Sequence, residues 1–455
     1  MRHNIQIRVP SNLAIDLRRI LTETIAYHEP VVFAMASSAV TAGRELVLIK
    51  ELIVPPETVF VRTNAHGAKW TGRFNIELMN RCAESSCGLI IFHRHPGRSV
   101  HLSDDDRQSA EALIPYFQSA VPQRYHGSLV LGDDSVAGMV WRPAQQSAEE
   151  AVDVRFLGGQ TLTYSAQSFS NVDQYAFTHV PLAYGTITRH SLASTSVAVV
   201  GLSGGGSQLV TQLAAIGIGG IVAVDPQRFE SENRLSTDAP RFFDIALHLH
   251  KTSVVKRQVL AINPRCSFRA IRAAVPSKET IAALREVDIV IGCVNNLQAR
   301  ADMLEIAGRY GIPYIDIGFN VGVDHGIECG SQVISLPGNV FTIIPGSACM
   351  WCSGFLTKAK LQKEMGGADR SYFKLKRGTR SDAAKALVVP FNGVLASSAA
   401  TEVLQLVVGF NAERTGSVYR KYDGFSGEMS NWGVQRNEDC WHCKNVVHAG
   451  DALWS

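Results

Sequence analysis

The chain has 455 residues, enough for two or three domains, and the composition of an ordinary soluble globular protein. A net charge of +3 neither favours nor excludes nucleic acid, and no long charge run is present, so we expect no nucleic-acid partner. The N-terminus lacks the apolar core of a signal peptide, and the apolar stretch 213–224 is too short to cross a membrane. Nine cysteines in a chain without a signal peptide are typical of a reducing compartment. We therefore expect a cytoplasmic protein without a membrane partner.

Residues 1–145 are predicted to form a first domain of α/β type. After a helix-like stretch, residues 31–36 and 46–54 have the apolar pattern of strands, residues 74–81 begin a helix, and residues 88–92 form a buried strand. This last strand leads directly into the polar sequence HRHPGRSVHLSDDD. The end of the strand is therefore the place to look for chemistry.

Two histidines alternate at the end of that strand. His93 and His95 point to the same face, where two imidazoles can bind one metal ion, and Asp106 is close enough in the chain to add an oxygen ligand. Three protein ligands leave a fourth position of zinc open for water, as in catalytic sites. The alternative is a pair of surface histidines next to an acidic cluster that only caps a helix.

The complete string resembles the signature of the JAB/JAMM metallopeptidases, a family that includes deubiquitinating isopeptidases. The matching residues of H-x-H-P and S-x-x-D are His93, His95, Pro96, Ser103 and Asp106. The resemblance implies a cytidine-deaminase-like α/β domain with a catalytic zinc. It also implies that Glu29, in HEPVVFAMASS, is the general base and that Ser103 helps to stabilise the oxyanion. Glu45 and Glu51 remain alternatives for the base, because the Cys and Gly of the family's opening motif are absent.

Residues 146–190 are polar, then acidic, and later rich in small polar side chains. This composition predicts a linker followed by a segment that leads into a second domain, residues 191–455.

The second domain begins with a strand, a glycine turn, a helix and another strand. Apolar residues 197–200 and 221–224 are the strands, and the turn and the second strand end supply Gly201, Gly204, Gly206 and Asp225. Glycines let backbone N–H groups approach phosphate oxygens at a helix N-terminus, and an acid at the next strand end can bind a ribose hydroxyl. The pattern predicts a nucleotide site, although a glycine turn alone can be structural.

The following residues resemble the ThiF/MoeB superfamily, which activates ubiquitin-like and sulfur-carrier proteins. GLSGGG fits its GxGGxG loop, Asn233 follows the ribose acid, and Lys251 precedes the Ile-Asn-Pro of residues 262–264. The resemblance implies a Rossmann-like, mainly parallel sheet that binds ATP and Mg²⁺ and adenylates the C-terminal glycine of a carrier. Lys251 would hold the phosphates of ATP, and Asn233 with Arg234 would lie where negative charge develops at the α-phosphorus. The alternative for Lys251 and Arg234 is that each is an ordinary surface charge.

Two Cys-x-x-Cys pairs lie in the C-terminal half, Cys349 with Cys352 and Cys440 with Cys443. Four thiolates satisfy tetrahedral zinc and leave no open position, which predicts a structural site, whereas a disulfide or redox pair is the alternative. The resemblance implies the same tetracysteine zinc.

Several positions depart from the ThiF/MoeB pattern. The family's second acid is Gln227, its magnesium-associated aspartate is Asn295, and its arginine after the asparagine is Ser236. The expected crossover stretch, residues 353–389, contains no cysteine for a thioester. The chain then either passes the adenylate directly to an acceptor or uses a distant residue such as Cys329, and loss of adenylation is a further alternative.

Together, the two resemblances indicate a fusion in a bacterial ubiquitin-like pathway. One half would process the tail of a ubiquitin-like protein and the other would activate its carboxylate, with a homodimer and a conjugating enzyme as expected partners. Three alternatives stay open: a sulfur-carrier activator, a carrier-binding scaffold with a degenerate site, and an NAD-dependent oxidoreductase. The sequence does not identify the carrier, the acceptor or the pathway.

Overall fold

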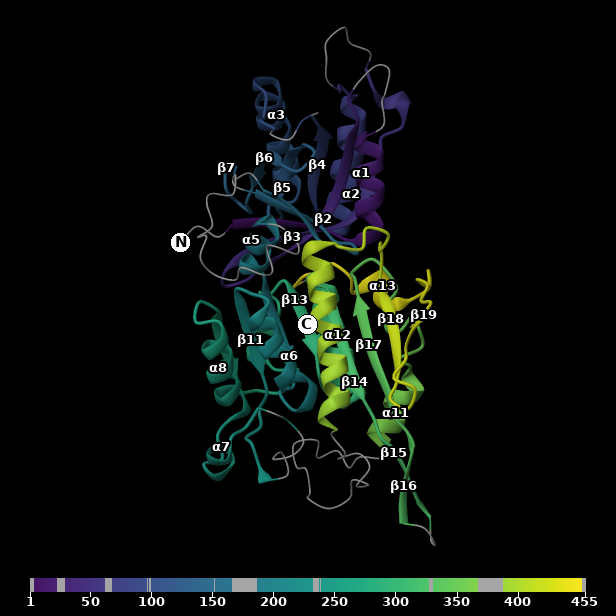
Figure 1. Cartoon of the computed structure of the whole chain (residues 1–455). Helices are drawn as coiled ribbons and strands as arrows, with labels where there is room; N and C mark the ends of the chain where they lie inside the picture. Colours follow the sequence, from purple (N-terminus) through teal and green to yellow (C-terminus); the bar gives the residue numbers. More distant parts are fainter. Residues whose placement is uncertain are drawn as a thin grey trace. The chain divides into compact units, whose positions relative to one another are not determined.

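Figure 1 shows the chain as a computed structural model. The structure describes residues 4–22, 29–61, 68–95, 97, 100–150, 152–165, 186–231, 237, 239–326, 330–366 and 388–451. The chain divides into two compact units: unit 1 comprises Met1–Asn171, Gly308–Gly311 and Asn445–Ser455, and unit 2 comprises Val172–Ala307 and Ile312–Lys444.

Unit 1 is built on a nine-stranded sheet with the order β7-β6-β5-β4-β2-β3-β1-β8-β9. Its elements, in chain order, are β1 (Asn4–Val9), α1 (Ser11–Thr22), β2 (Val31–Val40), β3 (Arg44–Ile53), η1 (Glu57–Val59), α2 (Gly72–Ser85), β4 (Gly88–Arg94), α3 (Asp104–Ala120), β5 (His126–Leu131), β6 (Val136–Trp141), β7 (Ala148–Glu149), β8 (Val152–Phe156) and β9 (Leu162–Ser165). The predicted linker is thus not a linker throughout. Its residues 148–165 carry three strands, and β8 pairs in parallel with β1.

The central strand β2 is buried on both faces of this sheet. Val32 and Ala34 belong to a core that also contains residues of α1, whereas Val31, Phe33 and Met35 belong to a second core with α2 and α3. Successive strand residues point to opposite faces, so a strand between two cores is apolar at nearly every position. This explains why the sequence predicted β2 and β4 clearly.

Unit 2 is built on an eight-stranded sheet with the order β12-β11-β10-β13-β14-β17-β18-β19. The strands from β12 to β14 are parallel and the last three are antiparallel. The elements are α5 (Thr186–Ser194), β10 (Ser196–Val200), α6 (Gly204–Ala215), β11 (Gly220–Val224), α7 (Phe242–Ala246), α8 (Lys251–Ile262), β12 (Ser267–Ile271), α9 (Lys278–Leu284), β13 (Ile289–Gly292), α10 (Leu297–Arg309), β14 (Tyr314–Phe319), β15 (Gly322–Gly326), β16 (Gly330–Ser335), β17 (Pro337–Ile343), α11 (Lys358–Gly366), α12 (Val389–Val408), β18 (Val418–Asp423), β19 (Met429–Trp432) and α13 (Trp441–Asn445). The predicted α/β fold with a mainly parallel sheet is confirmed for this unit.

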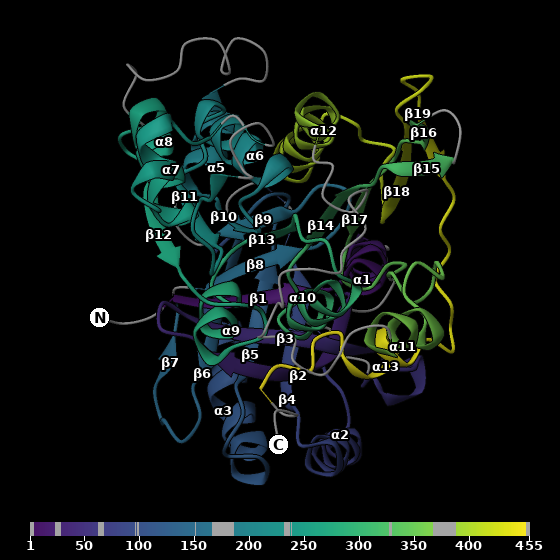
Figure 2. The same cartoon turned by 90° about the horizontal axis from the view of Figure 1, so that it is seen from below.

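Helices cover both faces of this second sheet. Figure 2 shows α6 and α12 on one face and α9 and α10 on the other, the arrangement of a doubly wound sheet. Parallel strands then end at one common edge, where β10, β11 and β13 deliver the loops that follow them. Ligands of such folds bind at this edge.

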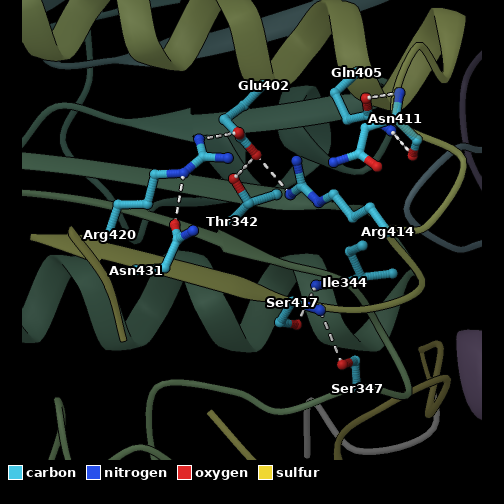
Figure 3. A network of polar contacts seen from close by, with 10 residues as sticks. All are labelled: Thr342, Ile344, Ser347, Glu402, Gln405, Asn411, Arg414, Ser417, Arg420 and Asn431. Atoms are coloured by element: carbon cyan, nitrogen blue, oxygen red, sulfur yellow. Dashed lines mark hydrogen bonds and ion pairs between the residues drawn. The ribbon is translucent and has the colours of Figure 1, made fainter. Parts of the chain in front are cut away.

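The helix α12 is long and apolar enough to cross a membrane by length and composition alone, but half of its apolar window is buried inside the fold. It packs against α6, β14 and β17. Figure 3 shows how Glu402 anchors it: Thr342 Oγ1 donates to the carboxylate at 2.6 Å, and Arg414 and Arg420 form ion pairs with it. A buried glutamate is retained here because two cations and a hydroxyl compensate its charge. These contacts are typical of a core helix.

Candidate functional site

The glycine loop after β10 requires glycines because the chain approaches itself closely there. Gly201 has φ +91°, and a Cβ on it would lie 2.6 Å from the carbonyl oxygen of Cys293. A Cβ on Gly206 would lie 1.8 Å from the carbonyl oxygen of Gly201. At Gly204 a Cβ would lie 2.7 Å from Nδ2 of Asn392 on α12. The loop therefore packs tightly between β13 and α12 and brings the N-terminus of α6 to the sheet edge.

Asp225 at the end of β11 is directed at this loop. Its Oδ2 accepts a hydrogen bond from the backbone N–H of Leu202 and its Oδ1 accepts one from that of Gln227, both at 2.8 Å. The carboxylate is buried and holds the loop against β11. A ribose hydroxyl would have to share these oxygens with the backbone.

Lys251, the first residue of α8, lies at the same loop. Its Nζ donates to Ser203 Oγ and to Gln227 Oε1, each at 2.7 Å, although only 2% of the residue is exposed. Burial lowers the pKa of Lys251, and the charges of Asp225 and Glu230 oppose this shift. The structure thus brings Lys251, Asp225 and the glycine loop together.

The residue at the magnesium-associated position fits that ion poorly. Asn295 is exposed shortly after β13 and offers a neutral amide oxygen, as does Gln227 at the position of the family's second acid, whereas Mg²⁺ sites in proteins depend on carboxylates. The oxygen of Gln227 is also occupied by Lys251. Asn233, Arg234 and Ser236 lie outside the described residues. In the described part of the chain, no predicted ligand supplies a free carboxylate for this metal.

The site also contains side chains that the sequence did not indicate. Glu364 of α11 accepts hydrogen bonds from the backbone N–H groups of Leu297 and Gln298, at 2.9 and 3.3 Å, and so caps the N-terminus of α10. Arg300 of the same helix is paired with Asp316, which has no exposed surface. Burial raises the pKa of Asp316 to about 6 against the effect of the arginine. Only the three-dimensional fold joins these residues, so no local pattern could have revealed them.

The four predicted zinc cysteines of unit 2 form one cluster. The sulfur of Cys349 lies 3.7 Å from those of Cys352 and Cys440, and the sulfur of Cys443 lies 3.5 Å from those of Cys349 and Cys352. Four sulfurs at about 2.3 Å from a tetrahedral zinc are about 3.8 Å apart, whereas a disulfide needs about 2.05 Å. The cluster fits zinc and does not fit disulfides.

In unit 1, the register of the sheet explains how the predicted peptidase residues meet. Val31 of β2 is opposite His93 of the antiparallel β4, so Glu29, two residues earlier, lies opposite His95. One possible ligand atom from each of Glu29, His93 and His95 falls within 4.8 Å of the others. Asp106 lies against both histidines, with oxygens 3.1 Å from Nε2 of His93 and 3.7 Å from Nε2 of His95.

These residues fit a metal ion. The buried Nε2 of His93 has no aligned hydrogen-bond partner in the described part of the chain, although Asp106 is adjacent. A buried polar atom without a partner is costly unless a ligand satisfies it, and two imidazoles with a carboxylate form a zinc donor set. Burial raises the pKa of Asp106, but His93 and Ser103 outweigh it and keep this pKa well below its usual range.

Ser103 and the rival glutamates have other roles in the structure. Ser103 Oγ donates to Asp106 Oδ2 at 2.7 Å and accepts from the Asp106 N–H, a capping box at the start of α3. The hydroxyl thus orients Asp106 and would have to rotate to reach an oxyanion. Glu45 accepts from Tyr125 and Arg142, and Glu51 is paired with Arg81. Of the three candidate bases, Glu29 is the one brought to the histidines.

The parallel sheet and the glycine loop give unit 2 the form of a Rossmann-like α/β unit, with a buried lysine at the loop. A profile of the ThiF family matches residues 177–442, more than half of the chain. The chain belongs to the ThiF family.

Individual relatives match over different parts of the sequence. The chain is 21% identical over 259 residues to the molybdopterin-synthase adenylyltransferase of Escherichia coli K12, covering 56% of this chain and 89% of that protein. It is 32% identical over 109 residues to a probable molybdopterin-synthase adenylyltransferase of Porphyra purpurea, covering 24% of this chain and 28% of that protein. With the SAMP-activating enzyme E1 of Haloferax volcanii it shares 24% identity over 183 residues, which span 40% of this chain and 62% of that protein.

Among solved structures, the crystal structure of E. coli MccB with MccA is similar at 18% identity and a TM-score of 0.44. The similarity covers 57% of this chain and 69% of that chain. A score this low carries no argument of its own.

Proposed function

We propose that unit 2 adenylates the C-terminal carboxylate of a small carrier protein. The observation that carries this proposal is the buried Lys251 at the glycine loop, opposite Asp225. Lys251 and the N–H groups at the start of α6 would bind the phosphates of ATP, and Asp225 would bind the ribose. The carrier carboxylate then attacks the α-phosphorus, the bond to the β,γ-diphosphate breaks, and pyrophosphate leaves. The chain contributes position and positive charge.

The class of substrate rests on the relatives. Two are named molybdopterin-synthase adenylyltransferases, and a third is named as an enzyme that activates SAMP. We infer that this chain also acts on the tail of a ubiquitin-like or sulfur-carrier protein. A sulfur-carrier activator would pass its adenylate to a persulfide, whereas a conjugation factor would pass it to a conjugating enzyme or directly to an amine.

Direct transfer of the adenylate fits the cysteines that the structure describes. Residues 353–389 contain none. Cys293 lies near the glycine loop, but burial raises the pKa of its thiol, so it is a poor nucleophile. Cys349, Cys352, Cys440 and Cys443 belong to the zinc cluster. Cys329 lies outside the described residues.

We further propose that unit 1 is a zinc-dependent peptidase that cuts after the carrier's terminal glycine. His93, His95 and Asp106 would hold the ion, which supplies a Lewis acid when bound. The carboxylate of Glu29 would take a proton from the attacking water and return it to the leaving nitrogen. Both units would then act on the same glycine tail in a cytoplasmic, bacterial pathway. We expect the chain to work as a homodimer.

The adenylation proposal is tested by ATP–pyrophosphate exchange, with a ubiquitin-fold protein that ends in Gly-Gly as carrier. Lys251→Ala should reduce carrier-dependent exchange at least about tenfold. Lys256→Ala removes an exposed lysine of the same helix and is the matched control. Exchange that persists unchanged in Lys251→Ala would contradict the assignment. ATP and carrier binding without exchange would favour the scaffold, and binding of NAD(H) in place of ATP would favour an oxidoreductase.

A further inference from the structure

The buried ammonium of Lys251 is held by neutral oxygens alone. Its two hydrogen-bond partners are a hydroxyl, Ser203 Oγ, and an amide oxygen, Gln227 Oε1. Among the described residues, Lys251 forms no ion pair: the charges of Asp225 and Glu230 act on it from a distance, and both oxygens of Asp225 accept hydrogen bonds from backbone N–H groups. The phosphate-binding end of the site thus contains a cation without a directly bound counter-ion.

Such a cation favours the binding of an anion. Lys251 is buried, so its charged form is less well solvated than in water; burial therefore lowers its pKa, against the charges of Asp225 and Glu230. An anion that reaches Nζ restores this lost solvation. Because the surroundings are partly shielded from water, the attraction between lysine and anion is stronger than it would be on the surface.

Hydrogen-bond donors remain for that anion. An ammonium has three N–H bonds, and Lys251 uses two of them. Ser203 Oγ accepts from Lys251, and in the described part of the chain its own hydrogen is donated to no other atom. Ser203 is also the N-cap residue of α6, where the first N–H groups of the helix are directed outward. Lysine, serine and helix terminus therefore converge on one place.

We propose that Gln227 and Ser203 make this a polyphosphate site that binds the nucleotide phosphates directly, without a divalent cation. The proposal rests on the proposed adenylation and names the residues that decide its phosphate recognition. A carboxylate at position 227 would pair with Lys251 and offer a ligand to Mg²⁺, and the amide does neither. Asn295, at the magnesium-associated position, is also an amide.

The test is isothermal titration of the full chain with ATP and with inorganic tripolyphosphate, each in excess EDTA and in excess Mg²⁺. The wild type should bind both ligands in EDTA within about threefold of its affinity in Mg²⁺. Gln227→Glu should weaken binding in EDTA at least about tenfold and make it depend on Mg²⁺. Gln362→Glu adds the same charge at an exposed position of α11 and should behave as the wild type.

A second variant, Ser203→Ala, keeps the test valid if Gln227→Glu does not fold. Ser203→Ala should weaken tripolyphosphate binding in EDTA several-fold while the melting temperature stays unchanged. A wild type that loses at least about tenfold affinity in EDTA, or a Gln227→Glu variant with unaltered binding, would overturn the proposal. If that wild type still catalyses exchange with Mg²⁺, the proposed adenylation stands and only this inference fails. If it binds ATP under neither condition, both fail.

Discussion

Asp225 and Lys251 are separated by 26 positions in the sequence, yet both contact residues of one short loop, Leu202 and Ser203. The aspartate accepts a hydrogen bond from the loop N–H of Leu202, and the lysine donates one to the hydroxyl of Ser203. Loop, acid and cation are therefore held together by hydrogen bonds of the chain itself. A preformed site loses less conformational entropy when its ligand binds.

For Glu29 we predict a role in proton transfer and none in metal binding. Glu29→Gln keeps the shape of the side chain but removes the proton acceptor, and it leaves the proposed zinc ligands His93, His95 and Asp106 in place. We expect the zinc content to stay the same and cleavage of a carrier fusion to fall by at least about 100-fold. Zinc analysis and a cleavage assay check this.

The control for Glu29 is Glu51→Gln, which removes an exposed ion pair with Arg81 and should leave cleavage unchanged. If cleavage survives in Glu29→Gln but is lost in Glu51→Gln, then Glu51 and not Glu29 is the general base.

The candidate ligands and the glycine loop could be predicted at this scale because each lies within a short stretch of sequence. His93 and His95 alternate on one strand, and Gly201 to Gly206 form one turn. Glu364 could not be predicted, since it caps α10 from 67 positions away in the sequence. The sequence alone shows that Gln227 stands where the family has an acid. That this glutamine accepts a hydrogen bond from Lys251 is seen only in the structure.

Among the elements, the position of α6 depends on the close approach of Gly206 to the backbone of Gly201. A Cβ on Gly206 would lie 1.8 Å from the Gly201 oxygen, far inside contact distance, so Gly206→Ala must displace α6 from β10. We expect ATP affinity to fall at least about tenfold, as measured by titration. Gly433→Ala is the control, because a Cβ there meets nothing within 4 Å. Equal ATP affinity in the two variants would show that the loop does not form the site.

The helix α12 should lose its anchor when Glu402 is neutralised. Glu402→Gln leaves Arg414 and Arg420 without their shared carboxylate, which should cost about 3 kcal/mol of unfolding free energy, measured with urea. Glu413→Gln changes an exposed glutamate and is the matched control. A loss below about 0.5 kcal/mol would mean that Glu402 does not hold the helix.

The same pair of arginines gives this anchor a pH dependence. They lower the pKa of Glu402 in the folded chain below the 4.5 of the free side chain, against the effect of burial. The unfolded chain therefore takes up this proton at a higher pH than the folded chain does. The stabilisation is present above about pH 4.5 and is lost as pH falls below it. In Glu402→Gln, this part of the acid sensitivity should disappear.

Elements with strong local patterns were predicted well, and those that depend on distant partners were not. Strands β10 and β11 with α6 appear where the sequence predicts them. The strands β8 and β9 were assigned to a linker because their composition is polar. Their stability comes from β1, about 150 positions earlier in the chain, to which β8 is paired. A pattern within one window of sequence contains no information about such a pairing.

For the whole molecule, the two proposed metal sites require two zinc ions per chain, one structural and one catalytic. The four sulfurs would complete a tetrahedral zinc, so removing them should destabilise unit 2, whereas the proposed histidine site has three protein ligands and its loss should leave the fold intact. The assignment of residues 308–311 and 445–451 to unit 1 has no signal in the sequence.

The most direct test is therefore the zinc content of the wild type and of two double variants, together with their thermal unfolding. We expect two zinc ions per chain, one in folded His93→Ala/His95→Ala and one in a destabilised Cys349→Ser/Cys352→Ser. His101→Ala, which removes an exposed histidine of the same loop, should keep both. A wild type with a single zinc that is lost only with the cysteines would contradict the account, and unit 1 would then not be a zinc peptidase.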